Sequence, residues 1–290
     1  MRFAAKLEFE IESETIAAVK KMHKKITTVS QERLRDEITK IITHENSYRG
    51  LLLLKSTGIF RLLFPELSKL EKVEQSKKYH PEGDVLSHTF LLFKRAAQPL
   101  STVLAWAALL HDVGKFSTFK IRKGNPTFYR HEVEGATLAS KIMKKYCLPS
   151  TIIKEVENLI KDHLKLIHVK DMKDSTFKKL VNKSCNKNQP ARSYFQNLLT
   201  LFKLDSLASS GDLDNYAYGC ERLNNLQPGE ENPPPLLNGH DLTKMGFKPG
   251  PRFGSVLHKI RNMQLDGTIT STEEAKNTAL KLMHKKDNDE

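Results

Sequence analysis

Apolar residues recur along most of the chain at the three- and four-residue spacing of amphipathic helices. After Ser30 this spacing is kept by four aliphatic residues, Leu34, Ile38, Ile41 and Ile42. Charged residues occupy the other face of the same stretch, as on a solvated helix surface. Further helices are expected after Pro149 and between Tyr194 and Leu207. The pattern therefore predicts an all-α fold.

One predicted helix differs from the others because it is apolar on every face. No charge interrupts residues 103–110, and His111 and Asp112 follow where the helix should end. Gly114 comes next and suits the left-handed turn that closes many helices. An imidazole and a carboxylate at the end of a buried helix are costly unless they are paired. A divalent cation would pair with both, although an isolated His–Asp pair is more often a helix-terminal hydrogen bond.

Other potential metal ligands lie on or beside apolar helical stretches. His88 follows the helix start at Asp84, His131 opens a third helix, and His163 ends the helix that begins near Pro149. Asp205 lies inside an apolar stretch, where a carboxylate must be neutralised or paired. A helix bundle could direct all of these side chains into one cavity.

The order of these residues resembles the HD superfamily of metal-dependent phosphohydrolases. The resemblance implies that one divalent ion (Mg, Mn or Ni) is held by His88, His111, Asp112 and Asp205. It also implies hydrolysis of phosphomonoesters or 2′,3′-cyclic phosphates, with Asp112, Lys115 and His131 as catalytic residues. Lys115 would bind the phosphate, or would simply be solvated. His131 and His163 would bind a second metal or the phosphate, and a helix cap is the alternative for His131.

Charge and composition limit the partners and the compartment. The formal net charge of +13 favours a polyanionic partner, and RNA or DNA fits better than a bilayer. No apolar run approaches the roughly 20 residues that cross a membrane. Three widely separated cysteines, Cys147, Cys185 and Cys220, are typical of reduced thiols in a cytoplasmic protein.

Three further segments, residues 2–11, 32–38 and 58–67, resemble the class II tRNA nucleotidyltransferase and poly(A) polymerase family. The resemblance implies a neck and body in residues 1–75, an HD domain in residues 76–210, and a linker with a helical tail in residues 211–290. It also implies that tRNA or another RNA is the partner. The expected RNA contacts are basic residues of the neck and tail: Arg2, Lys6, Arg33, Arg35, Lys248, Arg252, Lys259 and Arg261.

Members of that family add nucleotides with a head domain that carries a Gly-Ser loop and paired aspartates. Asp212 and Asp214 are two carboxylates in sequence, but they stand near a helix start, where capping is the simpler role. Because two-metal phosphoryl transfer needs such carboxylates, this chain alone is not expected to add nucleotides.

The sequence thus predicts a metal-dependent phosphohydrolase within a tRNA-binding region, acting in tRNA 3′-end maturation or repair. The alternative is a non-catalytic tRNA-binding part whose nucleotidyltransferase head is missing or is a separate polypeptide. A decayed gene product is a third hypothesis.

Overall fold

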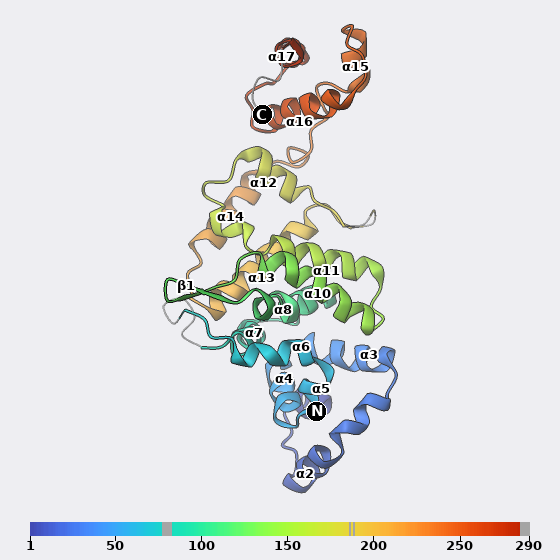
Figure 1. Ribbon diagram of the computed structural model, residues 1–290, viewed down its shortest axis with the longest axis vertical. Helices are drawn as coiled ribbons and strands as arrows, with labels where there is room; N and C mark the ends of the chain where they lie inside the picture. The colour runs from blue at the N-terminus through green and yellow to red at the C-terminus, as the bar shows by residue number, and fades with distance from the viewer. Residues whose placement is uncertain (77–82, 186, 188, 285–290) are drawn as a thin grey trace. The chain divides into compact units, whose positions relative to one another are not determined.

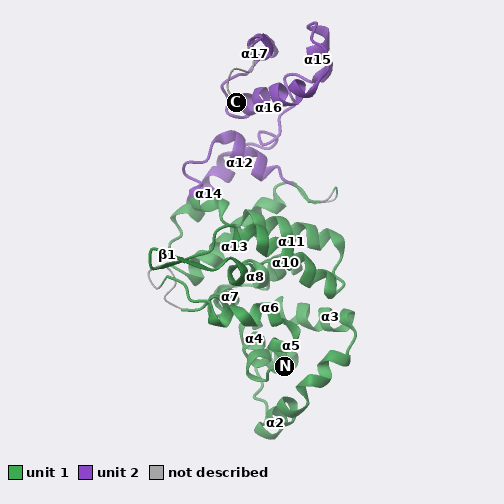
Figure 2. Ribbon diagram, in the orientation of Figure 1, with its two compact units in different colours: residues 1–167, 184–217 green, residues 168–183, 218–290 purple. Residues whose placement is uncertain are grey.

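The computed structural model describes residues 1–76, 83–185, 187 and 189–284. Every element in these residues is helical apart from one short hairpin (Figure 1), which confirms the predicted all-α fold. The chain forms two compact units, coloured separately in Figure 2. Unit 1 comprises Met1–Ile167 and Ser184–Ala217, and unit 2 comprises His168–Lys183 and Tyr218–Glu290.

Unit 1 begins with short helices. They are α1 (Arg2–Lys6), α2 (Ser13–Met22), η1 (His23–Thr28), α3 (Gln31–Ile42), α4 (Ser47–Ser56), α5 (Ile59–Leu63), α6 (Pro65–Ser68) and η2 (Lys69–Lys72). The apolar face predicted after Ser30 is buried along α3, where α3 packs on α4 and on α8. The Trp106 indole of α8 donates a hydrogen bond to Thr39 of α3 over 3.1 Å, which fixes α3 to α8.

The remaining helices of unit 1 pack into a bundle. They are α7 (Val85–Arg95), α8 (Thr102–Leu110), α9 (Lys115–Thr118), α10 (His131–Lys145), α11 (Ser150–Asp162) and α13 (Ser193–Ala208). The side chain of Asp84 caps α7 by accepting from the Ser87 amide over 2.9 Å. Ser101 caps α8 in the same way. Residues Leu104 to Leu110 of α8 are all buried, as their unbroken apolar run predicts.

The basic and aromatic stretch between Lys115 and His131 contains regular structure that the sequence analysis did not predict. It forms the short helix α9 and an antiparallel hairpin, β1 (Lys120–Arg122) and β2 (Asn125–Thr127). Lys123 and Gly124 join the strands, both with positive φ, at 49° and 74°. Two such residues form the tight turn that matches the twist of a hairpin.

Gly114 is required for a different reason from the one its position suggests. Its φ is −74°, in the right-handed region, so the expected left-handed turn is absent. A Cβ atom at Gly114 would lie 2.3 Å from the carbonyl oxygen of His131 and 2.6 Å from the amide nitrogen of Gly135. Only glycine therefore lets the backbone after α8 approach the first turn of α10.

Unit 2 contains α12 (Asp174–Val181), α15 (Gly239–Lys244), α16 (Pro251–Leu265) and α17 (Thr272–His284), while η3 (Lys165–His168) and α14 (Asp214–Asn225) cross its boundaries. Its core is built from apolar residues of the tail: Leu237, Leu242, Phe253, Val256, Ile260, Ile269, Ala275 and Ala279. Asp241, which follows a histidine, stabilises the start of α15. It accepts from the Asn238 amide, and the Asn238 side chain accepts in return from Asp241.

Among the described residues, none of the helices is both long enough and apolar enough to cross a bilayer.

Candidate metal centre

The predicted ligands, distant in sequence, converge in unit 1. His88 lies on α7, His111 and Asp112 directly follow α8, and His131 is the first residue of α10. His163 directly follows α11, and Asp205 lies near the end of α13. Four of these side chains, those of Asp112, His131, His163 and Asp205, line one cavity of about 300 Å³. Asp205 is partly exposed, whereas the other five residues are buried.

One group of close side-chain atoms involves His88, His111, Asp112 and Asp205. His88 Nε2 lies 2.9 Å from Asp205 Oδ1, and His111 Nε2 lies 3.2 Å from Asp112 Oδ2. The two cross distances, His88 to Asp112 and His111 to Asp205, are both 3.9 Å between the same atoms. Ligand atoms around one ion lie about 3–4 Å apart, because each bond is roughly 2 Å long. His88, His111 and Asp112 therefore have the spacing of a metal site, and Asp205 lies beside them through its contacts with His88 and His111.

A second group shares Asp112 with the first. Its other oxygen, Oδ1, lies 3.4 Å from His131 Nε2, which in turn lies 3.4 Å from His163 Nε2. Two three-residue sets could each hold an ion: His88, His111 and Asp112, and Asp112, His131 and His163. The carboxylate of Asp112 thus faces both sets with different oxygen atoms.

The tautomers of three histidines are fixed by the backbone. The Nδ1 atoms of His111, His131 and His163 each lie within hydrogen-bond distance of the carbonyl oxygen three residues earlier, at 3.0, 2.9 and 2.6 Å. A carbonyl can only accept, so Nδ1 carries a proton in each ring, and Nε2 is the nitrogen that faces the centre. His111 Nε2 is buried without a hydrogen-bond partner in the described part of the chain. A cation would satisfy it.

Electrostatics favour the ionised form of the two carboxyls and the neutral form of His163. Burial alone would raise the pKa of the Asp112 carboxyl, but the nearby charges of His111 and Lys115 hold it well below its usual value. Burial likewise opposes ionisation of Asp205, yet the hydrogen bond and charge of His88 lower the pKa of its carboxyl. Burial, with the charges of His111 and His131, lowers the pKa of His163 to about 4. Metal ligands need anionic carboxylates and neutral imidazoles.

Lys115 is buried rather than solvated, so that alternative for it was wrong. Its Nζ lies 2.8 Å from Asp112 Oδ2 and donates to Gln75 Oε1 over 2.7 Å. The ammonium therefore balances the charge of Asp112. Gln75 was not foreseen as part of the centre. It lies in a loop, and nothing in its sequence surroundings indicates its contact with a residue of α9.

Asp162, the residue directly before His163, is buried and makes polar contacts within the bundle. Its Oδ2 accepts from the Tyr194 hydroxyl over 2.7 Å, and Lys165 Nζ lies 2.9 Å from its Oδ1. Asp162 thus joins α11 to α13. The next residue, His163, belongs to the second three-residue set that could hold an ion.

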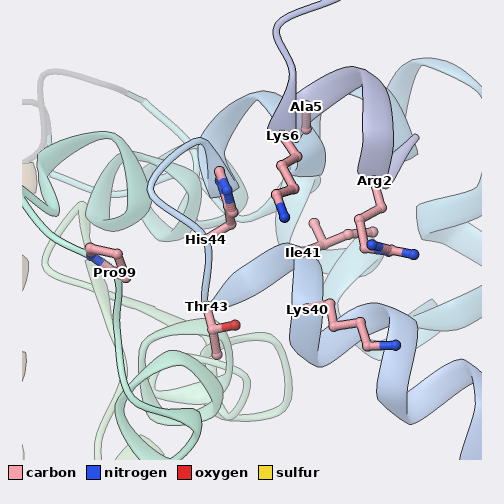
Figure 3. Close-up of a pocket in the computed structure, with 8 residues that line it drawn as sticks. All are labelled: Arg2, Ala5, Lys6, Lys40, Ile41, Thr43, His44 and Pro99. Carbon is pink, nitrogen blue, oxygen red and sulfur yellow. The ribbon is translucent and has the colours of Figure 1, made fainter.

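The eight expected RNA contacts divide into two classes. Four arginines make contacts within the fold: Arg2 with Glu37, Arg35 with the Cys147 carbonyl, Arg252 with the Leu282 carbonyl and Arg261 with the Pro233 carbonyl. Lys6, Arg33, Lys248 and Lys259 are exposed. Figure 3 shows Arg2, Lys6 and Lys40 around a pocket of about 380 Å³ beside α3. Their role in RNA binding stays a prediction.

The lowered pKa of His163 predicts acid sensitivity in chelator-treated protein. As the pH falls below about 6.5, His163 becomes protonated in the unfolded chain, whereas in the folded protein it stays neutral until about pH 4. The free energy of unfolding should therefore fall between pH 6.5 and 4, and His163→Gln should make this fall shallower. Urea unfolding at several pH values measures it, with the exposed His168 replaced in the control variant. Equal slopes in the wild type and His163→Gln would contradict the prediction.

The sequence matches two protein families and several known proteins. Residues 8–70 match the family described as "Probable RNA and SrmB- binding site of polymerase A", and residues 84–196 match the HD domain family. The A-adding tRNA nucleotidyltransferase of Deinococcus radiodurans is 31% identical over 295 aligned residues, covering 95% of this chain and 65% of that protein. The multifunctional CCA protein of Neisseria meningitidis serogroup A is 30% identical over 208 residues, covering 71% of this chain and 49% of its own length.

A solved structure has the same fold at lower sequence identity. The Thermotoga maritima CCA-adding enzyme complexed with tRNA aligns with a TM-score of 0.50 and 17% identity, over 98% of this chain and 59% of that one. The chain thus spans between about half and two thirds of the length of these proteins. It is homologous to A-adding and CCA-adding tRNA nucleotidyltransferases over the part that includes the two family matches, residues 8–70 and 84–196.

Proposed function

We propose that the bundle of unit 1 is a metal-dependent phosphohydrolase that acts on phosphomonoester or 2′,3′-cyclic phosphate ends of RNA, in tRNA 3′-end maturation or repair. The observation that carries the proposal is the arrangement of the potential metal-ligand atoms. The Nε2 atoms of His88 and His111 lie 2.9–3.9 Å from carboxylate oxygens of Asp112 and Asp205. The rings of His111, His131 and His163 are each held by the backbone carbonyl three residues earlier. This second layer of hydrogen bonds is typical of metal ligands.

The residues present would divide the work as follows. His88, His111, Asp112 and Asp205 would hold the ion. A divalent ion supplies Lewis acidity, which offsets phosphoryl charge and makes water more acidic. His131 and His163 line the same cavity and can hold a phosphate oxygen or move a proton at Nε2. Lys115 orients Asp112 through its 2.8 Å ion pair.

Removal and return of metal tests this proposal directly. Chelation with EDTA should abolish release of phosphate, or opening of the cyclic phosphate, from RNA oligonucleotides with these ends. Adding Mg²⁺, Mn²⁺ or Ni²⁺ separately should restore activity and identify the preferred ion. Mass spectrometry of the RNA products distinguishes the two reactions. Hydrolysis at full rate in EDTA, or none with any of the ions, would contradict the proposal.

A second candidate function is non-catalytic binding of tRNA on behalf of a nucleotidyltransferase head, and the match of residues 8–70 to an RNA-binding family favours it. Binding of this kind should weaken steeply with salt, because each neutralised phosphate releases counterions.

The double variant Lys248→Ala/Lys259→Ala should reduce the slope of log affinity against log salt by about 1.8, since each contact with duplex phosphates contributes roughly 0.9. Fluorescence anisotropy with labelled tRNA measures this slope. His111→Ala should bind tRNA as the wild type does. An unchanged slope would exclude these two lysines from the RNA contact.

A further inference from the structure

The segment between the two halves of the metal centre, residues 116–130, exposes large apolar side chains, and we call it the hairpin arm. Tyr129 is 78% exposed and Ile121 is 69% exposed, and Phe116 and Phe119 are also exposed. Side chains of this size usually lie at least partly in a core. Figure 1 shows the arm, labelled at β1, beside the bundle helices of unit 1.

The same segment carries four exposed cations, Lys120, Arg122, Lys123 and Arg130. None of them forms an ion pair with any residue that the structure describes. This distinguishes them from Arg2 and Arg35, whose guanidinium groups contact Glu37 and Asp36. The positive charge of the arm is therefore available to a ligand from solution.

A shallow pocket of about 250 Å³ lies along the arm. Its lining combines cations, an aromatic ring, hydroxyls and one acid: Lys120, Arg122, Tyr129, Ser117, Thr118, Thr127 and Glu134. The three hydroxyls donate to carbonyl oxygens of Gly114 and Lys120. Their oxygen lone pairs remain able to accept hydrogen bonds from a ligand, for instance from a ribose hydroxyl or a base N–H group.

The base of the arm is packed directly on the metal centre. The ring of Phe128 lies 5.9 Å from the ring of Phe119, 5.3 Å from Lys115 Nζ and 6.4 Å from the ring of His131. Lys115 and His131 are also the residues that flank the arm in sequence. A chain bound along the arm is thus led toward the cavity that the metal ligands line.

We propose that the hairpin arm binds the single-stranded end of an RNA, and the proposal rests on the phosphohydrolase function proposed above. Tyr129 and Ile121 contact base faces, while Lys120 and Arg122 contact phosphates. Aromatic faces interleaved with cations are the usual surface for unpaired nucleic acid. An anionic membrane would also suit exposed rings and cations, but the hydroxyl-lined pocket and the adjoining phosphate centre favour RNA.

Fluorescence anisotropy with a short unpaired RNA that ends in a 3′-hydroxyl tests the proposal without any hydrolysis. Tyr129→Ala should weaken binding roughly tenfold or more, and Tyr129→Phe should preserve it, because stacking needs only the ring. Lys120→Ala/Arg122→Ala should reduce the salt slope by about 1.4, at roughly 0.7 per single-strand contact. The matched control is Lys141→Ala/Lys144→Ala, which removes two exposed lysines of α10 and should leave affinity and slope unchanged.

Wild-type affinity in Tyr129→Ala would overturn the proposal. The proposal would also be overturned if the wild type bound phosphatidylserine vesicles and Tyr129→Ala lost this binding but kept its RNA binding. The hydrolysis assay separates this proposal from the one on which it rests. If the arm delivers substrate, Tyr129→Ala lowers kcat/KM for RNA with a 2′,3′-cyclic phosphate end but not for a 2′,3′-cyclic mononucleotide. The two proposals can also fail separately. If the wild type hydrolyses neither substrate but binds RNA, and the arm variants lose this binding, the phosphohydrolase function is wrong and the RNA-binding role of the arm stands.

Discussion

His111→Ala should lose bound metal and at least about a hundredfold of its hydrolytic rate, since even indirect partners of metal ligands are worth roughly 10- to 100-fold. His111 Nε2 and Asp112 Oδ2 are both buried without a hydrogen-bond partner in the described residues, and removal of the imidazole leaves a gap opposite Asp112 and Asp205. Elemental analysis of the purified protein gives the metal content. Hydrolysis of RNA with a 2′,3′-cyclic phosphate end gives the rate.

His168→Ala is the matched control, because it removes an exposed imidazole from the same region of sequence as His163. It should retain both the metal and the activity. Circular dichroism and thermal unfolding establish that His111→Ala is folded. A folded His111→Ala variant with wild-type metal content and rate would remove the basis for the proposed centre.

Gly114→Ala should destabilise the protein by about 3 kcal/mol or more, at the upper end of what overpacking costs. The new Cβ would meet backbone atoms, the His131 carbonyl oxygen at 2.3 Å and the Gly135 nitrogen at 2.6 Å. Backbone cannot rotate away as a side chain can, so the first turn of α10 must move, and His131 moves with it. Urea unfolding gives the stability, and metal content reports the damage to the centre.

Gly254→Ala provides the opposite control. Gly254 lies within α16, and a Cβ atom there would meet nothing within 4 Å. Replacing a mid-helix glycine with alanine usually raises stability by roughly 0.5–1 kcal/mol. If the two variants were equally stable, the close approach at Gly114 would not be a constraint on the fold.

The sequence was sufficient for features that depend on local periodicity. The unbroken apolar run before His111 predicts a buried helix, and that helix in turn requires a partner for the His111–Asp112 pair. The spacing of apolar residues also places His88, His131, His163 and Asp205 on or at the ends of helices. Because the bundle is built from these helices, their convergence could be anticipated.

Contacts through space could not be read in the same way. Lys115 could be solvated or bound to phosphate as far as its neighbours in sequence show, and only packing brings Gln75 and Asp112 to it. Basic residues present a similar difficulty. The sequence does not distinguish Arg252, whose guanidinium reaches the Leu282 carbonyl, from the exposed Lys248. The hairpin was missed because its strands are only three residues long, which is too short for an alternating pattern to stand out.

The path of the chain through the two units restricts how such a protein can be shortened or recombined. Residues 168–183 belong to unit 2, but the chain returns to unit 1 before it completes unit 2 from residue 218 onward. Truncation after residue 217 would leave α12 behind without Asp266, which accepts from the Ser175 amide, and without Arg222, whose guanidinium covers the Phe177 ring. The tail, from residue 218 onward, therefore cannot be exchanged as an independent domain. Its loss or replacement in evolution would require compensating changes in a segment that lies before α13, inside the stretch that matches the HD family.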